Sequence, residues 1–204
     1  MISDSPENLV PMNIFASRWP LQTELVYSLP DHPSNHFGQI YHPGARLLWL
    51  HKDLAAVVLA AARILNEARG WKVILCDGLR PVDAQEKMRQ KNVTTPDMLA
   101  LPGQGAHPRG LAIDLVILDE KETKIDMGTE FDYFPPDPRA DNPAARDYPD
   151  FGSPARTLAV WQNRAALEGA MRWAASRLAF PLWPLPHEWW DFRSEKAHFE
   201  NRRA

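Results

Sequence analysis

The run Ala112–Leu118 is the feature that most constrains the fold, because every side chain in it except Asp114 is apolar. Such a run predicts a strand with at least one buried face. A carboxylate inside it must be paired, protonated or bound to a metal, since burying an unpaired charge is costly. His107 precedes it on a loop rich in Gly and Pro. These residues alone leave open whether Asp114 forms an ordinary ion pair, for example with Arg109, or belongs to a functional site.

The composition is that of an ordinary globular protein. The chain has 204 residues, of which 45% are hydrophobic and 24% charged, so we expect a single domain spanning residues 1–204. The net charge of -3 gives no basic surface for nucleic acid. No apolar run reaches membrane-spanning length and no signal sequence opens the chain, so we expect no membrane partner and a cytoplasmic location. Nothing in the sequence indicates the oligomeric state.

The periodicity of apolar residues predicts three helices and three main strands. Helices are expected over residues 46–69, before the stop at Gly70, over 82–90 and over 157–178. Strands are expected over residues 71–76, 112–118 and 188–192. Six residues are predicted to form the core face of the last helix: Leu158, Trp161, Ala165, Leu167, Met171 and Ala175.

Three polar stretches can be combined into a hydrolytic metal site. Such a site needs about three protein ligands, an open position for water and a nearby base. His107 and Asp114 would supply two ligands. Glu188 and Asp191 lie three residues apart in a Trp-rich segment, so one could complete the ligand set while the other transfers protons. Arg80 would stabilise negative charge that develops on a carbonyl oxygen, although it could instead simply pair with Asp77.

These stretches resemble the signatures of the VanX-type D-Ala-D-Ala dipeptidases, a family of zinc enzymes. The family patterns are S-x-H-x-x-G-x-A-x-D and E-x-W-H, and this chain keeps His107, Gly110, Ala112, Asp114, Glu188 and Trp190 of them. Further similarities lie at residues 35–41, 77–81, 127–132 and 163–164, so the resemblance covers nearly the whole chain. Together with the predicted elements, it implies a single α+β domain with a mostly antiparallel central sheet flanked by helices.

The resemblance implies a role for each matching residue. His107 and Asp114 become ligands of one Zn²⁺ per chain. Glu188 becomes the general base that activates the zinc-bound water and later protonates the leaving amine, and Arg80 polarises the scissile carbonyl. Asp132 receives the ammonium group of a small zwitterionic dipeptide, and two further residues, Asp77 and Trp190, are predicted to contribute to substrate binding.

The chain departs from the family pattern at three positions. Asp191 occupies the place of the third zinc ligand, which is His in the family, while Gly105 replaces Ser and Leu79 replaces Tyr. Three interpretations of Asp191 are open. In the first, Asp191 is itself a ligand, in a site that accepts Mn or Fe as readily as Zn. In the second, His187 or His198 binds the metal instead. In the third, the metal has been lost.

The expected function is metal-dependent hydrolysis of D-Ala-D-Ala or a closely related D-amino-acid dipeptide, in the turnover of cell-wall peptides. The alternatives are a peptidase of the same mechanism that acts on another small dipeptide or a peptidoglycan stem peptide, and a metal-free protein that binds such peptides. A binding protein needs neither a base nor an oxyanion donor. The presence of both Glu188 and Arg80 therefore favours an enzyme.

Overall fold

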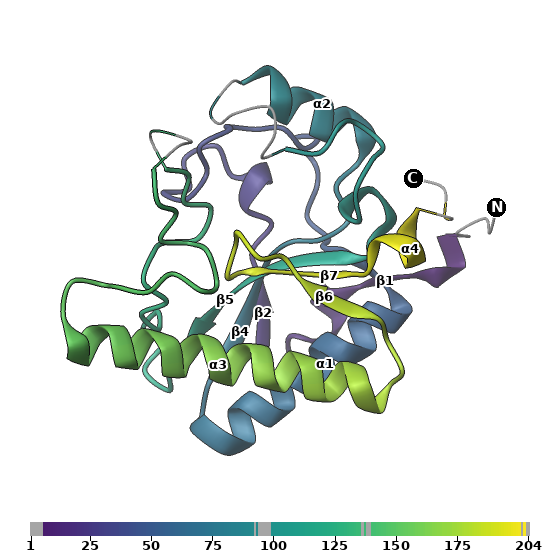
Figure 1. Ribbon diagram of the computed structural model, residues 1–204. Coiled ribbons are helices and arrows are strands. Elements are labelled where there is room, and N and C mark those ends of the chain that lie inside the picture. The colour runs from purple at the N-terminus through teal and green to yellow at the C-terminus, as the bar shows by residue number, and fades with distance from the viewer. Residues whose placement is uncertain are drawn as a thin grey trace.

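A five-stranded sheet lies at the centre of the structure, a computed structural model that describes residues 6–91, 93, 99–135, 137, 140–200 and 202 (Figure 1). The strand order is β2-β4-β5-β7-β6. The first pair is parallel and the other three pairs are antiparallel. The strands are β2 (Leu21–Thr23), β4 (Lys72–Asp77), β5 (Ala112–Leu118), β6 (Leu182–Pro184) and β7 (Asp191–Ser194). The predicted α+β class with a mostly antiparallel sheet is confirmed.

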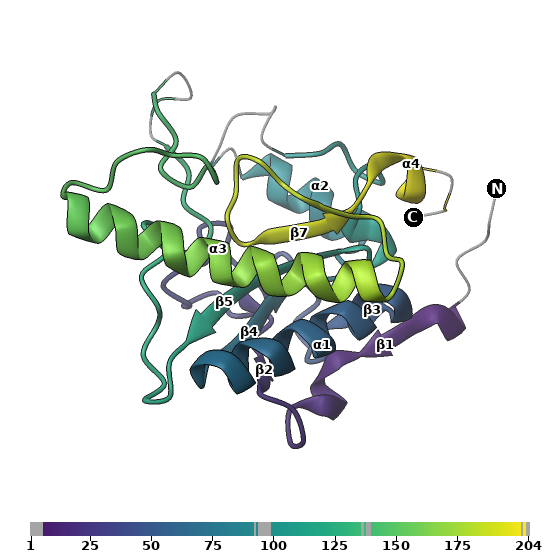
Figure 2. The same ribbon diagram turned by 60° about the horizontal axis from the view of Figure 1, so that its bottom comes forward.

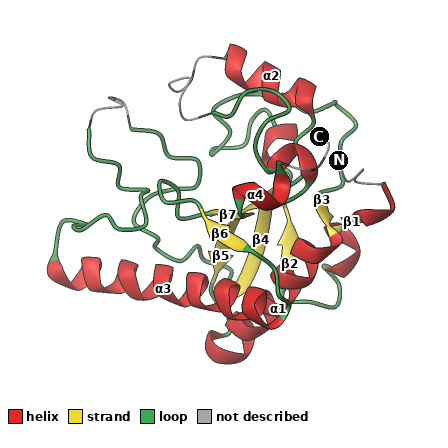
Figure 3. Ribbon diagram, turned by 45° about the vertical axis from the view of Figure 1, so that its right-hand side comes forward, coloured by secondary structure: helices red, strands yellow, loops and turns green. Residues whose placement is uncertain are grey.

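Helices cover the sheet from two sides. The two long helices, α1 (Lys52–Arg69) and α3 (Pro154–Arg177), pack against each other below the sheet in Figure 1, whereas α2 (Val82–Gln90) lies above it. The view in Figure 2 shows α1 and α3 running side by side. A short helix, α4 (Lys196–Phe199), follows the last strand. Figure 3 shows that the long loops gather on the same side as α2.

One hydrophobic cluster of buried side chains connects these layers. It includes Leu54 and Val58 of α1, Leu75 of β4, Ile113 of β5 and Met171 of α3, each at most 1% exposed. All seven residues of β5 are buried, as its apolar run predicts. The sheet therefore holds the polar side chain of Asp114 inside the molecule. No described helix is both long and apolar enough to cross a membrane.

The first predicted helix was wrong at its start. Residues 46–51 are not helical, because Trp49–His51 forms a strand, β3, that pairs with β1 (Leu9–Pro11). The helix begins only at Lys52, where the side chain of His51 caps it by accepting a hydrogen bond from the backbone N–H of Asp53 (3.3 Å). Pairing with a segment about forty residues earlier overrode the local helical pattern.

Two further expectations also need correction. Leu158 and Trp161 were expected in the core, but they are 55% and 46% exposed, because α3 turns its other face to the sheet. The predicted strand 188–192 begins only at Asp191. Glu188 instead lies in the turn between β6 and β7. That turn is held from outside the sheet, since the N–H of Trp189 donates to the carbonyl of Ala144 (3.0 Å).

Candidate active site

Three aspartates form a row across the middle of the sheet. The register pairs Asp77 of β4 with Asp114 of β5, and Asp114 with Asp191 of β7. A shift in register between Leu75 and Asp77 brings Asp77 opposite Asp114. Like charges in neighbouring strands repel each other, and all three residues are at most 3% exposed. Such a row is stable only if cations lie beside it.

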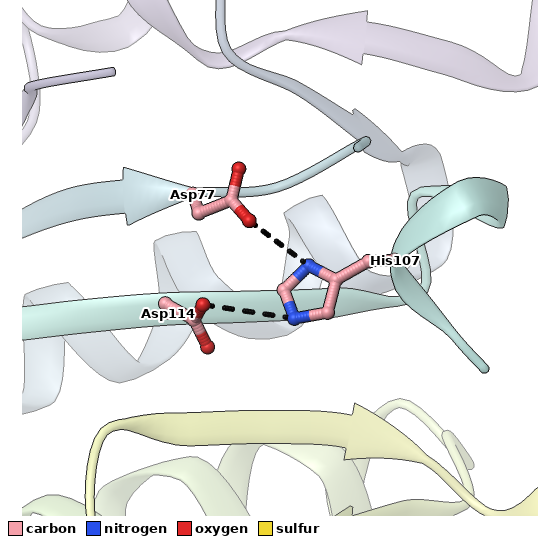
Figure 4. A group of neighbouring side chains, drawn as sticks. All are labelled: Asp77, His107 and Asp114. Atoms are coloured by element: carbon pink, nitrogen blue, oxygen red, sulfur yellow. Dashed lines mark ion pairs between the residues drawn. The ribbon is translucent and has the colours of Figure 1, made fainter. Parts of the chain in front are cut away.

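His107 lies at one end of this row, on a short 3-10 turn (His107–Arg109) that leads into β5. Its Nε2 atom is 3.6 Å from Oδ2 of Asp114 and 3.4 Å from Oδ2 of Asp191. Its Nδ1 atom donates to the carbonyl of Gly78 (2.8 Å), which can only accept, so Nε2 is the nitrogen that a metal ion could bind. Figure 4 shows the imidazole between Asp77 and Asp114.

Arg80 supplies the first cation. Its Nε and Nη2 atoms donate to Oδ2 of Asp77 (2.8 and 2.5 Å), and Nη1 donates to Gln85 (2.9 Å). The hydroxyl of Tyr41 donates to the other oxygen of Asp77. Nη2 of Arg80 also lies 3.6 Å from Oδ2 of Asp114. The pairing of Asp77 with Arg80 that the sequence left open is therefore present, and it fixes the guanidinium beside Asp114.

Arg193 supplies the second cation, which the sequence analysis missed. Its Nε donates to Oδ1 of Asp191 (2.7 Å) and its Nη2 to Oδ2 of the same carboxylate. The two residues lie two apart on β7, so their side chains share one face of the strand. The alternation of a strand was the signal that could have revealed this pair. The predicted strand ended at residue 192 and so left Arg193 outside it, whereas β7 continues to Ser194.

Glu188 is held by a loop rather than by the sheet. Arg146, in the loop before α3, donates from Nε to the carbonyl of Leu185 (2.9 Å) and from Nη2 to the carbonyl of Asp191 (2.7 Å). Arg164 of α3 in turn donates to the carbonyls of Pro143 and Ala145 in that loop (2.7 and 2.5 Å). We call residues 142–146 the strap. The strap anchors both ends of the turn that carries Glu188.

Asp132 lies in a strained position at the same site. Its backbone has a φ of 62°, in the left-handed region that residues other than Gly rarely adopt. The Oδ2 atom of its carboxyl group is buried without a hydrogen-bond partner among the described residues. A buried oxygen of this kind is prepared for a ligand that donates hydrogen bonds.

A cavity of about 550 Å³ joins these groups. Its polar wall contains all but one of the predicted site residues: Arg80, His107, Asp114, Asp132, Glu188, Trp190 and Asp191. Asp77 is the exception, since it is fully buried behind Arg80 and both its oxygens accept hydrogen bonds. Asp77 therefore orients the guanidinium of Arg80 and does not itself reach the cavity in which a substrate would bind. Tyr27, Gln85 and Arg193 also line the cavity.

Burial and mutual repulsion shift the acidity of the carboxyl groups. Burial, reinforced by the charge of Asp191, raises the pKa of Glu188 to about 7. Burial and Asp191 also raise the pKa of Asp114 well above its usual range, and burial with Glu188 does the same for Asp132. Although burial opposes it, the Arg193 guanidinium lowers the pKa of Asp191. Asp191 is thus ionised at neutral pH, while Glu188 is poised to exchange a proton there.

The donor set fits a divalent metal ion. Oδ1 of Asp114 is buried without a hydrogen-bond partner among the described residues, although carboxylate oxygens in such places are normally paired. Ligand atoms of Asp114, Glu188 and Asp191 lie within 4.8 Å of one another, as do those of Asp77, His107 and Asp114. Asp114 belongs to both groups, and Nε2 of His107 in the second group lies 3.4 Å from Oδ2 of Asp191 in the first. One imidazole nitrogen with carboxylate oxygens is a common ligand set for Zn²⁺ and for harder ions.

Similarity to a known family extends over most of the chain. The sequence model of the D-Ala-D-Ala dipeptidase family matches residues 20–203. The chain belongs to that family. It is 34% identical over 112 residues to the D-alanyl-D-alanine dipeptidase of Escherichia coli, a match that spans 55% of this chain and 55% of that protein. The alignment thus covers about half the length of this curated relative.

Among solved structures, the chain is similar to the crystal structure of the L-Ala D-Glu endopeptidase ChiX of Serratia marcescens. The sequence identity is 15% and the TM-score is 0.45, over 74% of this chain and 84% of the other.

The two other candidate ligands lie at different places. His187 lines the cavity next to Glu188, on the exposed part of the turn. His198 lies on α4, where its ring packs edge-on against Phe180 with the ring centroids 5.9 Å apart. Only His187 is therefore positioned as an alternative to Asp191.

Adding metal should remove a pH dependence of the protein's stability. The raised pKa values of Asp114, Asp132 and Glu188 stabilise the metal-free protein at a pH below the unfolded values of these groups. This stabilisation is lost as the pH rises towards 7, whereas Asp191 stays ionised throughout. We expect the melting temperature of metal-free protein to fall by roughly 5 °C between pH 5 and 7.5. Zinc should remove that fall, as scanning calorimetry with and without a chelator can test; an identical slope in both samples would argue against a metal at these carboxylates.

Proposed function

We propose that the chain is a metal-dependent dipeptidase that hydrolyses D-Ala-D-Ala or a closely related D-amino-acid dipeptide. The observation that carries the proposal is that one cavity brings together a base, a guanidinium, a histidine and the buried carboxylates that such a reaction requires. Family membership supports the same reaction class. A role in the turnover of cell-wall peptides follows from this substrate, and the cytoplasmic location remains a prediction.

In this proposal the metal ligands are His107, Asp114 and Asp191, and Zn²⁺ is the expected ion. When bound, the ion supplies a Lewis acid that polarises the scissile carbonyl and makes an attacking water more acidic. Asp191 would use one lone pair of Oδ2 for the metal and keep its bonds to Arg193, since a carboxylate has about four acceptor sites. Mn²⁺ or Fe²⁺ is an alternative because two of the three ligands are hard oxygens.

The chain's own groups perform the proton transfers and the charge stabilisation. Glu188, with its pKa raised to about 7, takes a proton from the attacking water and returns it to the leaving amine. Arg80 remains charged, because Asp77 raises its pKa against the effect of burial, and it stabilises negative charge on the carbonyl oxygen. Asp132 binds the ammonium end of the substrate through its unpaired oxygen.

The size of the cavity favours a second candidate substrate. A volume of about 550 Å³ is in the range of sites for drug-sized ligands, and it leaves room around a dipeptide of two alanines. A dipeptide with larger side chains, or part of a peptidoglycan stem peptide, would fill the cavity better. The same residues would catalyse its hydrolysis.

The decisive experiment combines metal analysis with activity. Protein purified without chelator should contain about one metal ion per chain and should hydrolyse D-Ala-D-Ala, with D-alanine release as the measurement. One metal without turnover would redirect the search to larger dipeptides. No metal and no turnover after addition of Zn²⁺ or Mn²⁺ would contradict the proposal and leave a peptide-binding protein as the better interpretation.

A further inference from the structure

Arg193 has more hydrogen-bond donors than its partner uses. Its Nε and Nη2 atoms bind Asp191, but Nη1, which carries two N–H groups, has no hydrogen-bond partner among the described residues. The side chain is 17% exposed and lines the cavity. The bidentate pair with Asp191 fixes the orientation of the guanidinium. Its unused N–H groups are therefore available to bind a second anion in the cavity.

Arg80, the other arginine in the cavity wall, is less suited to bind an additional anion. Its Nε and Nη2 atoms bind Asp77, and its Nη1 atom binds both Gln85 (2.9 Å) and the sulfur of Met88 (3.3 Å). Its side chain is also less exposed than that of Arg193, at 8% against 17%. Arg80 can therefore stabilise charge that develops at the reacting carbonyl, whereas a permanent carboxylate needs the donors of Arg193.

The cavity carries charges of both signs, as a zwitterion requires. Asp132, Glu188 and Arg193 all line it. Asp132 offers an unpaired oxygen for a cation, and Arg193 offers unpaired N–H groups for an anion. A peptide with both ends free carries one charge of each sign, so the two residues could each bind one of its ends.

We propose that Arg193 is a specificity-determining residue that binds the free carboxylate at the C-terminal end of the substrate. This inference rests on the proposed dipeptidase function and adds the group that recognises the second end of the peptide. Asp191 then has two roles, as a metal ligand and as the anchor that orients Arg193. The cavity selects peptides that end at the residue after the scissile bond.

The test compares D-Ala-D-Ala with the same dipeptide amidated at its C-terminus. For each variant the measured quantity is the ratio of the two kcat/KM values, which does not depend on how much of the protein is active or metal-loaded. A charge-assisted hydrogen bond to a carboxylate contributes roughly 10- to 100-fold, so the wild type should prefer the free acid by about that factor. Arg193→Met should reduce this ratio towards one, mainly by raising KM for the free acid. Arg193→Lys should retain part of the preference for the free acid.

A matched control is available outside the cavity. Arg156 also forms a two-point pair with an aspartate, through Nε and Nη2 to Asp126 (2.9 and 3.2 Å), and Arg156→Met should leave the ratio unchanged. If Arg193 acted only by holding Asp191, Arg193→Met would slow both substrates equally and preserve the ratio. That result would overturn the proposal.

Binding measurements separate this proposal from the proposed function. If the wild type hydrolyses neither peptide, calorimetric titration with D-Ala-D-Ala and with its amide gives the same comparison without turnover. Stronger binding of the acid that disappears in Arg193→Met would keep the role of Arg193 while removing the dipeptidase activity. Equal binding of both peptides, or binding of neither, would overturn it.

Discussion

Glu188→Gln is expected to lower kcat for dipeptide hydrolysis by about 10³-fold while the protein keeps its metal. Glutamine preserves the size and shape of the side chain but cannot accept the proton of the attacking water. Because Glu188 lies on a turn held by the strap, the substitution should not disturb the sheet that carries the other groups. Steady-state kinetics together with metal analysis of the same sample give the measurement.

Glu130→Gln provides the control for this experiment. Glu130 is exposed, pairs with Lys124 at 3.2 Å and is absent from the cavity wall, so its substitution should leave kcat unchanged. If Glu188→Gln retained full activity, another group would have to be the base. Loss of metal in Glu188→Gln would instead indicate that Glu188 is a ligand.

Asp191→Ala is expected to weaken zinc binding by at least about 100-fold, the upper end of the effect of losing a group that merely orients a ligand. The substitution removes one carboxylate from the cluster and leaves the charge of Arg193 without its partner, which further disfavours a cation. Asp191→His should retain the metal, because the imidazole is a common zinc ligand. Competition with a chromogenic chelator measures both affinities.

The same experiment examines the alternative ligand. Unchanged zinc affinity in Asp191→Ala would remove Asp191 from the ligand set. His187→Ala would then be the informative variant, since His187 lines the cavity beside Glu188. Loss of metal in His187→Ala alone would assign the third position to that histidine.

Local sequence patterns predicted those parts of the fold that depend on local interactions. The apolar run of β5 and the proline-initiated helix α2 have the predicted boundaries, because burial and a preset φ act within the segment itself. The start of α1 and the place of Glu188 were wrong. Both depend on distant partners, Leu9–Pro11 in one case and the loop carbonyl of Ala144 in the other. Patterns of neighbouring residues carry no information about such contacts.

The candidate site also has parts that local sequence predicts and parts that depend on distant contacts. Motifs and their spacing predicted His107, Asp114 and Glu188 as site residues, and these residues do line one cavity. The row of aspartates could not be predicted, since it depends on strand register and on an irregularity between Leu75 and Asp77. Arg193 was missed because its importance appears only when Asp191 is known to share its strand face.

The strap connects Glu188 to a helix that contributes no residue to the cavity wall. Arg164 of α3 holds the strap, and Arg146 within the strap holds the turn of Glu188. Glu188 is thus positioned through contacts with a long helix, whereas the three aspartates lie on strands of the sheet and His107 lies on the turn that leads into β5. In the proposed mechanism, substitutions along α3 would therefore change the position of the base and the rate of hydrolysis without altering any of the proposed metal ligands.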